Sequence, residues 1–233
     1  MRVIEVGPPT DLEVFIREGE SLGDIEERLS AFRVIQPGDL HAFDIRRLEG
    51  IYSFLEGASS LEGFLFPDTY RFRSDSDPEI VVRKFLDNFR IRTLPLVLGD
   101  ATRLLRVITI ASYLEREIPF TEDRPVVAGI LERRLRLGMP LQVDATVLYA
   151  KCEGRFKECP SLTRGDFSNP SPYNTYAHTG LTPGPIANPG FDALAAALRP
   201  RSSSYLYYLS DPKTKKTIFA KTLEEHNRNR RTY

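Results

Sequence analysis

The feature that most constrains this chain is an apolar stretch that ends in two glutamates, RVITIASYLEREIPF at residues 106–120. At about 100° per residue, an α-helix brings one set of side chains onto a single stripe, here Leu104, Ile108, Ala111, Glu115 and Ile118. The spacing therefore predicts a core helix. Glu115 stands where an apolar residue is expected, so its carboxyl group is either paired with Lys or Arg or lies at the floor of a cleft. Glu117 falls about 200° further round, and we expect it to be an ordinary charge on the solvated face.

Composition is that of an ordinary globular protein. The chain has 233 residues, of which 41% are hydrophobic, and 32 basic residues balance 32 acidic ones. This balance gives no indication of a nucleic-acid partner. No apolar run is long enough for a transmembrane helix, and no signal sequence is visible. The G-x-S-x-G, P-loop and G-x-G-x-x-G motifs are absent, which argues against serine-esterase and nucleotide chemistry.

Cysteines and histidines are few. Cys152 and Cys159 lie close together in KCEGRFKECP, whereas the three histidines are scattered along the chain. We therefore expect no metal site and no cofactor. The cysteine spacing fits a local disulfide, which implies an oxidising compartment, and it also fits two free thiols.

The order of the predicted elements indicates an α+β fold rather than a doubly wound sheet. Residues 12–18 alternate like a strand, Ser21 is placed to cap a helix, and a second helical pattern runs to about Leu55. Further helices are predicted over 78–95, around Glu115, and from a Thr121 cap to Gly138. A hairpin with its turn near Asp211 and a charged helix close the chain.

Residues 168–190 form a long segment that is rich in proline and glycine and almost free of charge. A disordered segment of this length would carry more charge and fewer apolar residues, so we predict an ordered loop that lines a site. Tyr173 and Tyr176 flank Asn174 and Thr175. Aromatic faces next to hydrogen-bonding groups suit a sugar, which offers C–H faces and hydroxyl edges.

Four blocks together resemble the YceG-like, or MltG-type, endolytic murein transglycosylases: LEGFLFPDTYRF (61–72), IASYLEREI (110–118), LQVDATVLY (141–149) and SPYNTYAHTGLTPGPIANPG (171–190). The resemblance covers nearly the whole chain. It implies a small LysM-like lobe at residues 11–56, followed by a larger mixed α/β catalytic domain at residues 61–233. The chain departs mildly from the usual sequence of the family at Arg116, Ala145 and Thr182. We interpret the Cys152–Cys159 insert as a local addition.

The resemblance also implies the activity, a lytic transglycosylase that cuts nascent peptidoglycan glycan strands into 1,6-anhydroMurNAc ends and terminates their elongation. Its setting would be the extracytoplasmic face of the cytoplasmic membrane, with peptidoglycan as substrate and cell-wall synthases as partners. Family members carry a membrane anchor that this sequence lacks, so the chain is expected to be trimmed or naturally short. That setting, and a turn at Gly154, favour the disulfide over free thiols.

The resemblance implies that Glu115, the first glutamate of the IASYLEREI block, is the catalytic acid and base. Burial would raise its pKa so that it can donate a proton near neutral pH. Seven residues are expected to bind substrate: Glu62, Gln142, Asp144, Tyr173, Asn174, Thr175 and Tyr176. Two alternatives remain open. One is a hydrolase that uses Glu115 and Asp144 as a carboxylate pair, and the other is a non-catalytic peptidoglycan-binding scaffold.

Overall fold

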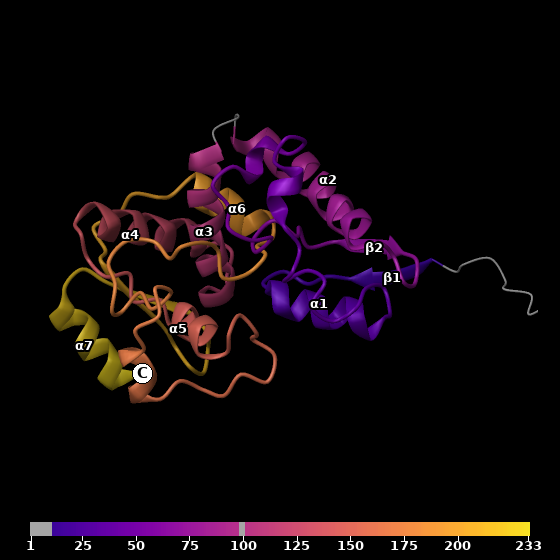
Figure 1. Cartoon of the computed structure of the whole chain (residues 1–233). Coiled ribbons are helices and arrows are strands. Elements are labelled where there is room, and N and C mark those ends of the chain that lie inside the picture. Colours follow the sequence, from indigo (N-terminus) through magenta and orange to yellow (C-terminus); the bar gives the residue numbers. More distant parts are fainter. Residues whose placement is uncertain (1–10, 98–100) are drawn as a thin grey trace, which may run out of the picture.

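The helix predicted around Glu115 lies at the centre of the molecule (Figure 1). In the computed structural model, which describes residues 11–97 and 101–233, α3 (Ala101–Glu117) contacts α4 (Arg124–Arg136), α5 (Asp144–Lys151) and α6 (Phe191–Leu198). Every residue from Val107 to Leu114 is buried. The predicted apolar stripe is confirmed, but α3 is enclosed on nearly all sides rather than along one face.

The N-terminal half is built on a two-stranded sheet. β1 (Leu12–Phe15) pairs antiparallel with β2 (Thr69–Phe72), and α1 (Leu22–Ala31) and α2 (Pro78–Val97) complete this part. The predicted Ser21 cap is confirmed, since its hydroxyl accepts from the Asp24 N–H in a capping box. The predicted second helix is wrong. Its place is taken by two short 3₁₀ helices, Ile45–Leu48 and Ser53–Leu55.

The sheet joins the two regions that the sequence divided at residues 57–60. Leu12 lies opposite Phe72 in the β1–β2 register, and one hydrophobic core runs without a break from Val14 to Ala197. Residues 11–56 are therefore joined to the region that follows them by strand pairing and by a shared core. The LysM-like character of those residues stays a prediction.

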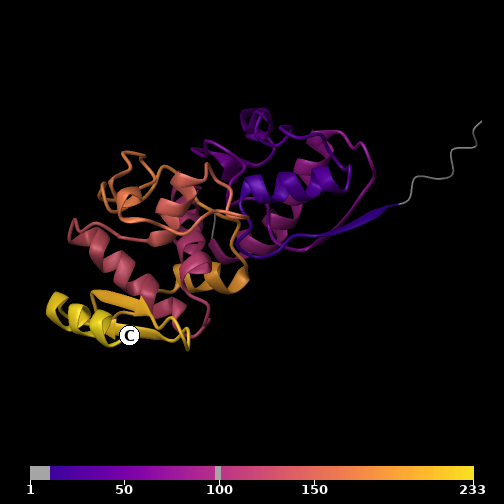
Figure 2. The same cartoon turned by 90° about the horizontal axis from the view of Figure 1, so that it is seen from below.

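The C-terminal end carries the predicted hairpin. β3 (Tyr207–Ser210) pairs antiparallel with β4 (Thr217–Ala220), and α7 (Leu223–Thr232) packs on both strands. Figure 2 shows this hairpin and α7 together at the end of the molecule opposite the N-terminal strand. Mixed helices and small antiparallel sheets confirm the α+β class. None of the helices in the described ranges is both long and apolar enough to cross a membrane.

Two local predictions concern α4 and the residues after it. Gly138 adopts a left-handed φ of 65° directly beyond the end of α4, as its predicted role as the stop requires. Thr121 is not the cap, because the helix begins at Arg124 and Asp123 precedes it. A further 3₁₀ helix, Arg164–Ser168, precedes the proline-rich loop.

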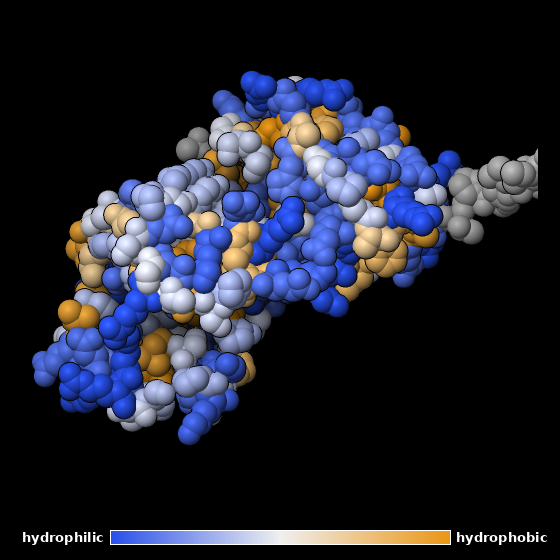
Figure 3. Space-filling view, turned by 60° about the horizontal axis from the view of Figure 1, so that its bottom comes forward, coloured by the Kyte–Doolittle hydropathy of each residue, from blue (hydrophilic) through white to orange (hydrophobic). Residues whose placement is uncertain are grey.

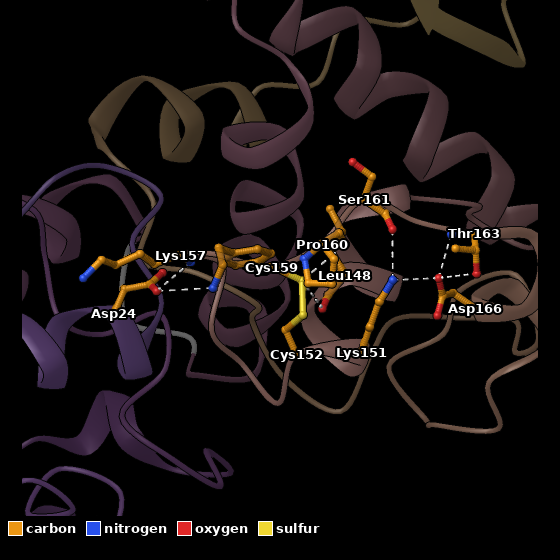
Figure 4. Close-up of a disulfide and its surroundings, with 11 residues drawn as sticks. Asp24, Leu148, Lys151, Cys152, Lys157, Cys159, Pro160, Ser161, Thr163 and Asp166 are labelled. Carbon is orange, nitrogen blue, oxygen red and sulfur yellow. Dashed lines mark hydrogen bonds and ion pairs between the residues drawn. A yellow bond between two sulfur atoms is a disulfide. The ribbon is translucent and has the colours of Figure 1, made fainter.

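The predicted disulfide between Cys152 and Cys159 is confirmed, with Cα atoms 6.0 Å apart. Figure 4 shows that the loop it closes reaches across to α1. There the Asp24 carboxylate accepts hydrogen bonds from the backbone N–H groups of Phe156 and Lys157, both at 3.2 Å. The loop thus ties the end of α5 to the N-terminal half.

Candidate active site

A cleft of about 620 Å³ lies where six segments of the C-terminal half meet. Its lining residues come from the ends of α3 and α4, the start of α5, the segment around Arg164 to Tyr176, strand β3 and helix α7. These segments are far apart in sequence and are brought together only by the fold. Within the described parts of the chain, no group of three or more His, Cys, Asp or Glu side chains could hold a metal ion.

Glu117, the last residue of α3, lines this cleft and is half-buried. Its Oε1 accepts a hydrogen bond of 2.6 Å from the Ala145 N–H, in the first turn of α5. Burial raises the pKa of Glu117 to about 7, and the nearby Asp144 carboxylate adds to the rise. The prediction of a solvated charge at Glu117 is wrong, because α5 covers the face of α3 that was expected to meet water.

Glu115 does not line the cleft. Its side chain is 6% exposed and forms a two-pronged ion pair with Arg124, at 2.7 Å to Nη2 and 3.4 Å to Nη1. The Gly190 N–H donates to its Oε2 at 3.0 Å, and Arg124 Nε donates to the Ile118 carbonyl oxygen. The sequence left two environments open for Glu115, a pair with Lys or Arg and the floor of a cleft. The structure shows the pair, with Arg124. With both carboxylate oxygens engaged, Glu115 is poorly placed to act on a ligand.

Gln142 and Asp144 both line the cleft, and their predicted binding of substrate stays a prediction. Both are exposed, and Asp144 Oδ1 accepts a hydrogen bond of 2.5 Å from the Tyr176 hydroxyl. Gln142 has a φ of 53°, a left-handed conformation that costs a residue with a Cβ atom about 1–3 kcal/mol and that clusters at functional sites. Asp144 is the first residue of α5, and Gln142 lies in the segment that leads into it.

The proline-rich loop contributes less to the cleft than expected, since only Tyr176 lines it. The buried Asn174 amide donates to the carbonyl oxygens of Phe167 and Asn169, at 3.0 and 2.7 Å. Thr175 is buried and accepts from the Val143 N–H at 2.9 Å. The polar atoms of Asn174 and Thr175 are thus engaged within the protein, and their predicted contact with substrate stays a prediction.

Glu62 is also part of the interior, with 1% of the residue exposed. Its carboxyl group accepts hydrogen bonds from the Leu22 N–H, the Asn188 amide and the Tyr149 hydroxyl, at 3.0 to 3.1 Å. Burial raises the pKa of Glu62 to about 8. Tyr173 packs on the Tyr149 ring at 4.9 Å and lies outside the cleft. Neither Glu62 nor Tyr173 lines this cleft, and their predicted contacts with substrate stay predictions.

Sequence reasoning missed the wall that α7 and β3 provide. Leu223, His226, Asn227 and Arg230 form a helical stripe that faces the cleft, and their spacing of three and four is visible in the sequence. Arg134 is also missed. It donates to the Leu206 and Leu141 carbonyl oxygens and lies over the Tyr207 ring, at 5.0 Å from its centroid. It thereby holds β3 beside the segment that precedes α5.

The fold and the cleft define an α+β protein with a half-buried carboxyl group among amide, phenol and carboxylate groups, a site suited to a polyhydroxylated ligand. The chain belongs to the YceG-like family, whose model matches residues 2–232. It is 39% identical over 177 residues to the endolytic murein transglycosylase of Bacillus subtilis, covering 74% of this chain and 48% of the relative. It is 32% identical over 225 residues to that of Streptococcus pneumoniae D39, covering 91% and 40%.

A solved structure has the same fold. The crystal structure of a YceG-like protein from Listeria monocytogenes superposes with a TM-score of 0.83 at 32% identity, covering 96% of this chain and 76% of that one. The chain spans less than half the length of the two transglycosylases.

Proposed function

We propose that this chain is an endolytic lytic transglycosylase that cleaves peptidoglycan glycan strands between MurNAc and GlcNAc and leaves 1,6-anhydroMurNAc ends. Family membership and the names of the two relatives support the reaction class. The observation that carries the proposal is the position of Glu117, which combines access to the cleft with a pKa of about 7.

We assign the acid and base role to Glu117 in place of Glu115. A glutamate with an ordinary pKa near 4.3 is almost fully ionised at neutral pH, whereas about half of the molecules retain the proton when the pKa is about 7. Glu117 donates this proton to the glycosidic oxygen as the bond to the anomeric carbon breaks. The resulting carboxylate then removes the proton from the 6-hydroxyl of the same muramyl ring, whose oxygen attacks the anomeric carbon. Water is not a reactant.

The groups around Glu117 fit this cycle. The Ala145 N–H donates to Oε1 and holds the carboxyl group in place in both protonation states. Asp144 opposes the charged form of Glu117, which favours the acid at the start of the cycle. Gln142 and Tyr176 offer hydrogen bonds to sugar hydroxyl and N-acetyl groups.

A second candidate is a hydrolase in which Glu117 and Asp144 act as a carboxylate pair. Its support is that both residues line one cleft, whereas Glu115, the partner first considered for Asp144, does not. A hydrolase would use the second carboxylate to activate water and would leave a reducing end.

The wider role is also a proposal. A transglycosylase of this kind acts in the cell envelope, at the outer face of the cytoplasmic membrane, and would limit the length of strands made by cell-wall synthases. Residues 11–56 would form a LysM-like lobe that helps to orient the glycan. The disulfide fits an oxidising compartment.

The experiment is mass analysis of the products from purified glycan strands, with Glu117→Gln and Glu115→Gln compared with the wild type. We expect wild-type products that are one water lighter than hydrolysed ends. Glu117→Gln should lower turnover by about 10²–10⁴-fold, because an amide cannot donate and recover the proton. Wild-type kcat/KM should fall as the pH rises above about 7, as Glu117 loses its proton.

Glu115→Gln separates catalysis from folding. The folded fraction of this variant should retain far more activity than Glu117→Gln. Reducing ends as the only product would replace the transglycosylase with the hydrolase. Full activity of Glu117→Gln would remove the acid assignment, and an inactive wild type that still binds glycan would favour the scaffold.

A further inference from the structure

The positive charge of this protein is concentrated at its C-terminal end. Residues 199–233 contain nine Lys and Arg against three Asp and Glu, although the whole chain has a net charge of zero. This segment forms the hairpin and α7, and in the space-filling view the end of the molecule that carries α7 is largely hydrophilic (Figure 3). A cleft wall with an excess of one charge attracts ligands of the opposite charge.

Two arginines of the cleft have side chains without a partner among the residues that the structure describes. Arg164 and Arg230 line the cleft and are exposed, and neither forms an ion pair or a hydrogen bond with any residue in the described ranges. Arg134, the third arginine of the cleft, differs, because backbone carbonyl oxygens and the Tyr207 ring hold it. Arg164 begins the 3₁₀ helix, and Arg230 lies in the last turn of α7, so the pair comes from two separate walls.

The neighbouring groups do not satisfy these arginines. Asp144 accepts the Tyr176 hydroxyl hydrogen bond, and Glu117 accepts that of the Ala145 N–H. His226 lies beside Arg230 on α7. Burial and the charges of Arg230 and Arg134 lower the pKa of His226, which keeps its ring neutral near pH 7. Its buried Nδ1 has no hydrogen-bond partner among the described residues. Among the described residues, the cleft therefore offers two arginines that lack an ion-pair partner, and Arg230 lies near a neutral ring.

We propose that Arg164 and Arg230 form a carboxylate-binding subsite next to Glu117, which recognises the carboxylate that the muramyl unit carries. The inference rests on the proposed function, because in a murein strand only the muramyl residues bear carboxylates, either on the lactyl group or on the attached peptide. A guanidinium group binds a carboxylate through paired N–H donors. The subsite would set which sugar of the strand lies at Glu117, since GlcNAc carries no charge.

Binding is measured in the Glu117→Gln background, so that strands are not consumed, with three soluble ligands. One carries stem peptides, the second has had the peptides removed and keeps one lactyl carboxylate per disaccharide, and the third is the second after conversion of its carboxylates to amides. The test variant is Arg164→Gln/Arg230→Gln. The matched control is Arg228→Gln/Arg231→Gln, which removes two charges from α7 that lie outside the cleft.

We expect the test variant to bind carboxylate-bearing strands about 2- to 30-fold more weakly, the range for two exposed ion pairs. Its affinity for the amidated strands should be unchanged, which also shows that the variant is folded. If the test variant loses affinity for both charged ligands, the subsite binds the lactyl carboxylate. If it loses affinity for the peptide-bearing strands alone, the subsite binds a carboxylate of the stem peptide. Both outcomes support the subsite.

Three outcomes would overturn the subsite: equal affinity of the test variant and its parent for all strands, an equal loss with the amidated strands, or a loss of the same size in the Arg228→Gln/Arg231→Gln control. Failure of the proposed function is distinguishable, since it appears as the absence of anhydro ends in the wild-type products, whatever the binding results.

Discussion

Glu115 and Glu117 are two residues apart on one helix and have opposite environments. Arg124 and the Gly190 N–H hold Glu115 as a structural carboxylate, whereas Glu117 accepts a hydrogen bond from the Ala145 N–H and lines the cleft. Burial raises the pKa of Glu117 more than the attraction of nearby Arg116 lowers it. The carboxyl group that reaches the cleft is therefore one that can hold a proton near neutral pH.

Glu115→Gln should destabilise the fold. Its loss leaves the Arg124 guanidinium, whose side chain is 6% exposed, without an anionic partner. Breaking a buried pair in this way costs about 3–5 kcal/mol, which urea unfolding measures. Glu115→Gln/Arg124→Met serves as the control and should recover part of the loss, because no unpaired charge remains. A Glu115→Gln variant as stable as the wild type would show that the pair does not hold the fold together.

Glu62 should make stability depend on pH. With a folded-state pKa of about 8 against an ordinary value of 4.5, the folded protein keeps a proton that the unfolded chain releases. Its contribution to the free energy of unfolding is therefore present below about pH 4.5 and is lost as the pH rises towards 8. Relative to the wild type, Glu62→Gln should gain on the order of 5 kcal/mol across this window. Parallel stability curves for the two proteins would exclude this titration.

Among the elements, the disulfide loop links α5 to α1 through Asp24. Cys152→Ala/Cys159→Ala should lower the free energy of unfolding by about 2–3 kcal/mol, because the unfolded chain regains the freedom of a short closed loop. Denaturant unfolding measures the loss, and reduction of the wild type should reproduce it. Unchanged stability in both would mean that the contacts of the loop hold it without the bridge.

At the scale of the whole molecule, residues 61–233 should not fold alone. Removal of the preceding region strips β1 from β2, takes the Leu22 N–H from Glu62 and opens the shared core. We expect a fragment without a cooperative thermal transition, measured by circular dichroism. The full chain in the same buffer is the control. A fragment that unfolds cooperatively and still cuts glycan would establish residues 61–233 as an independent domain.

Much of the local structure can be predicted from sequence alone. The core helix around Glu115, the Ser21 cap, the Gly138 stop, the C-terminal hairpin and the Cys152–Cys159 pairing depend on residues close together in the chain. Periodicity, capping and turn chemistry are short-range effects, and they operate in any tertiary context that does not oppose them. The spacing of Leu223, His226, Asn227 and Arg230 on α7 is a short-range pattern of the same kind, and it predicts that they share one face of the helix.

The site was decided by tertiary structure. Helical periodicity gives the angle between Glu115 and Glu117 around the helix axis, but not what covers each direction. Because α3 is enclosed, neither residue points simply into solvent. Arg124 of α4 neutralises one carboxylate, and the start of α5 buries the other beside a cleft. These neighbours come from other helices, and their positions depend on long-range packing that no local pattern encodes.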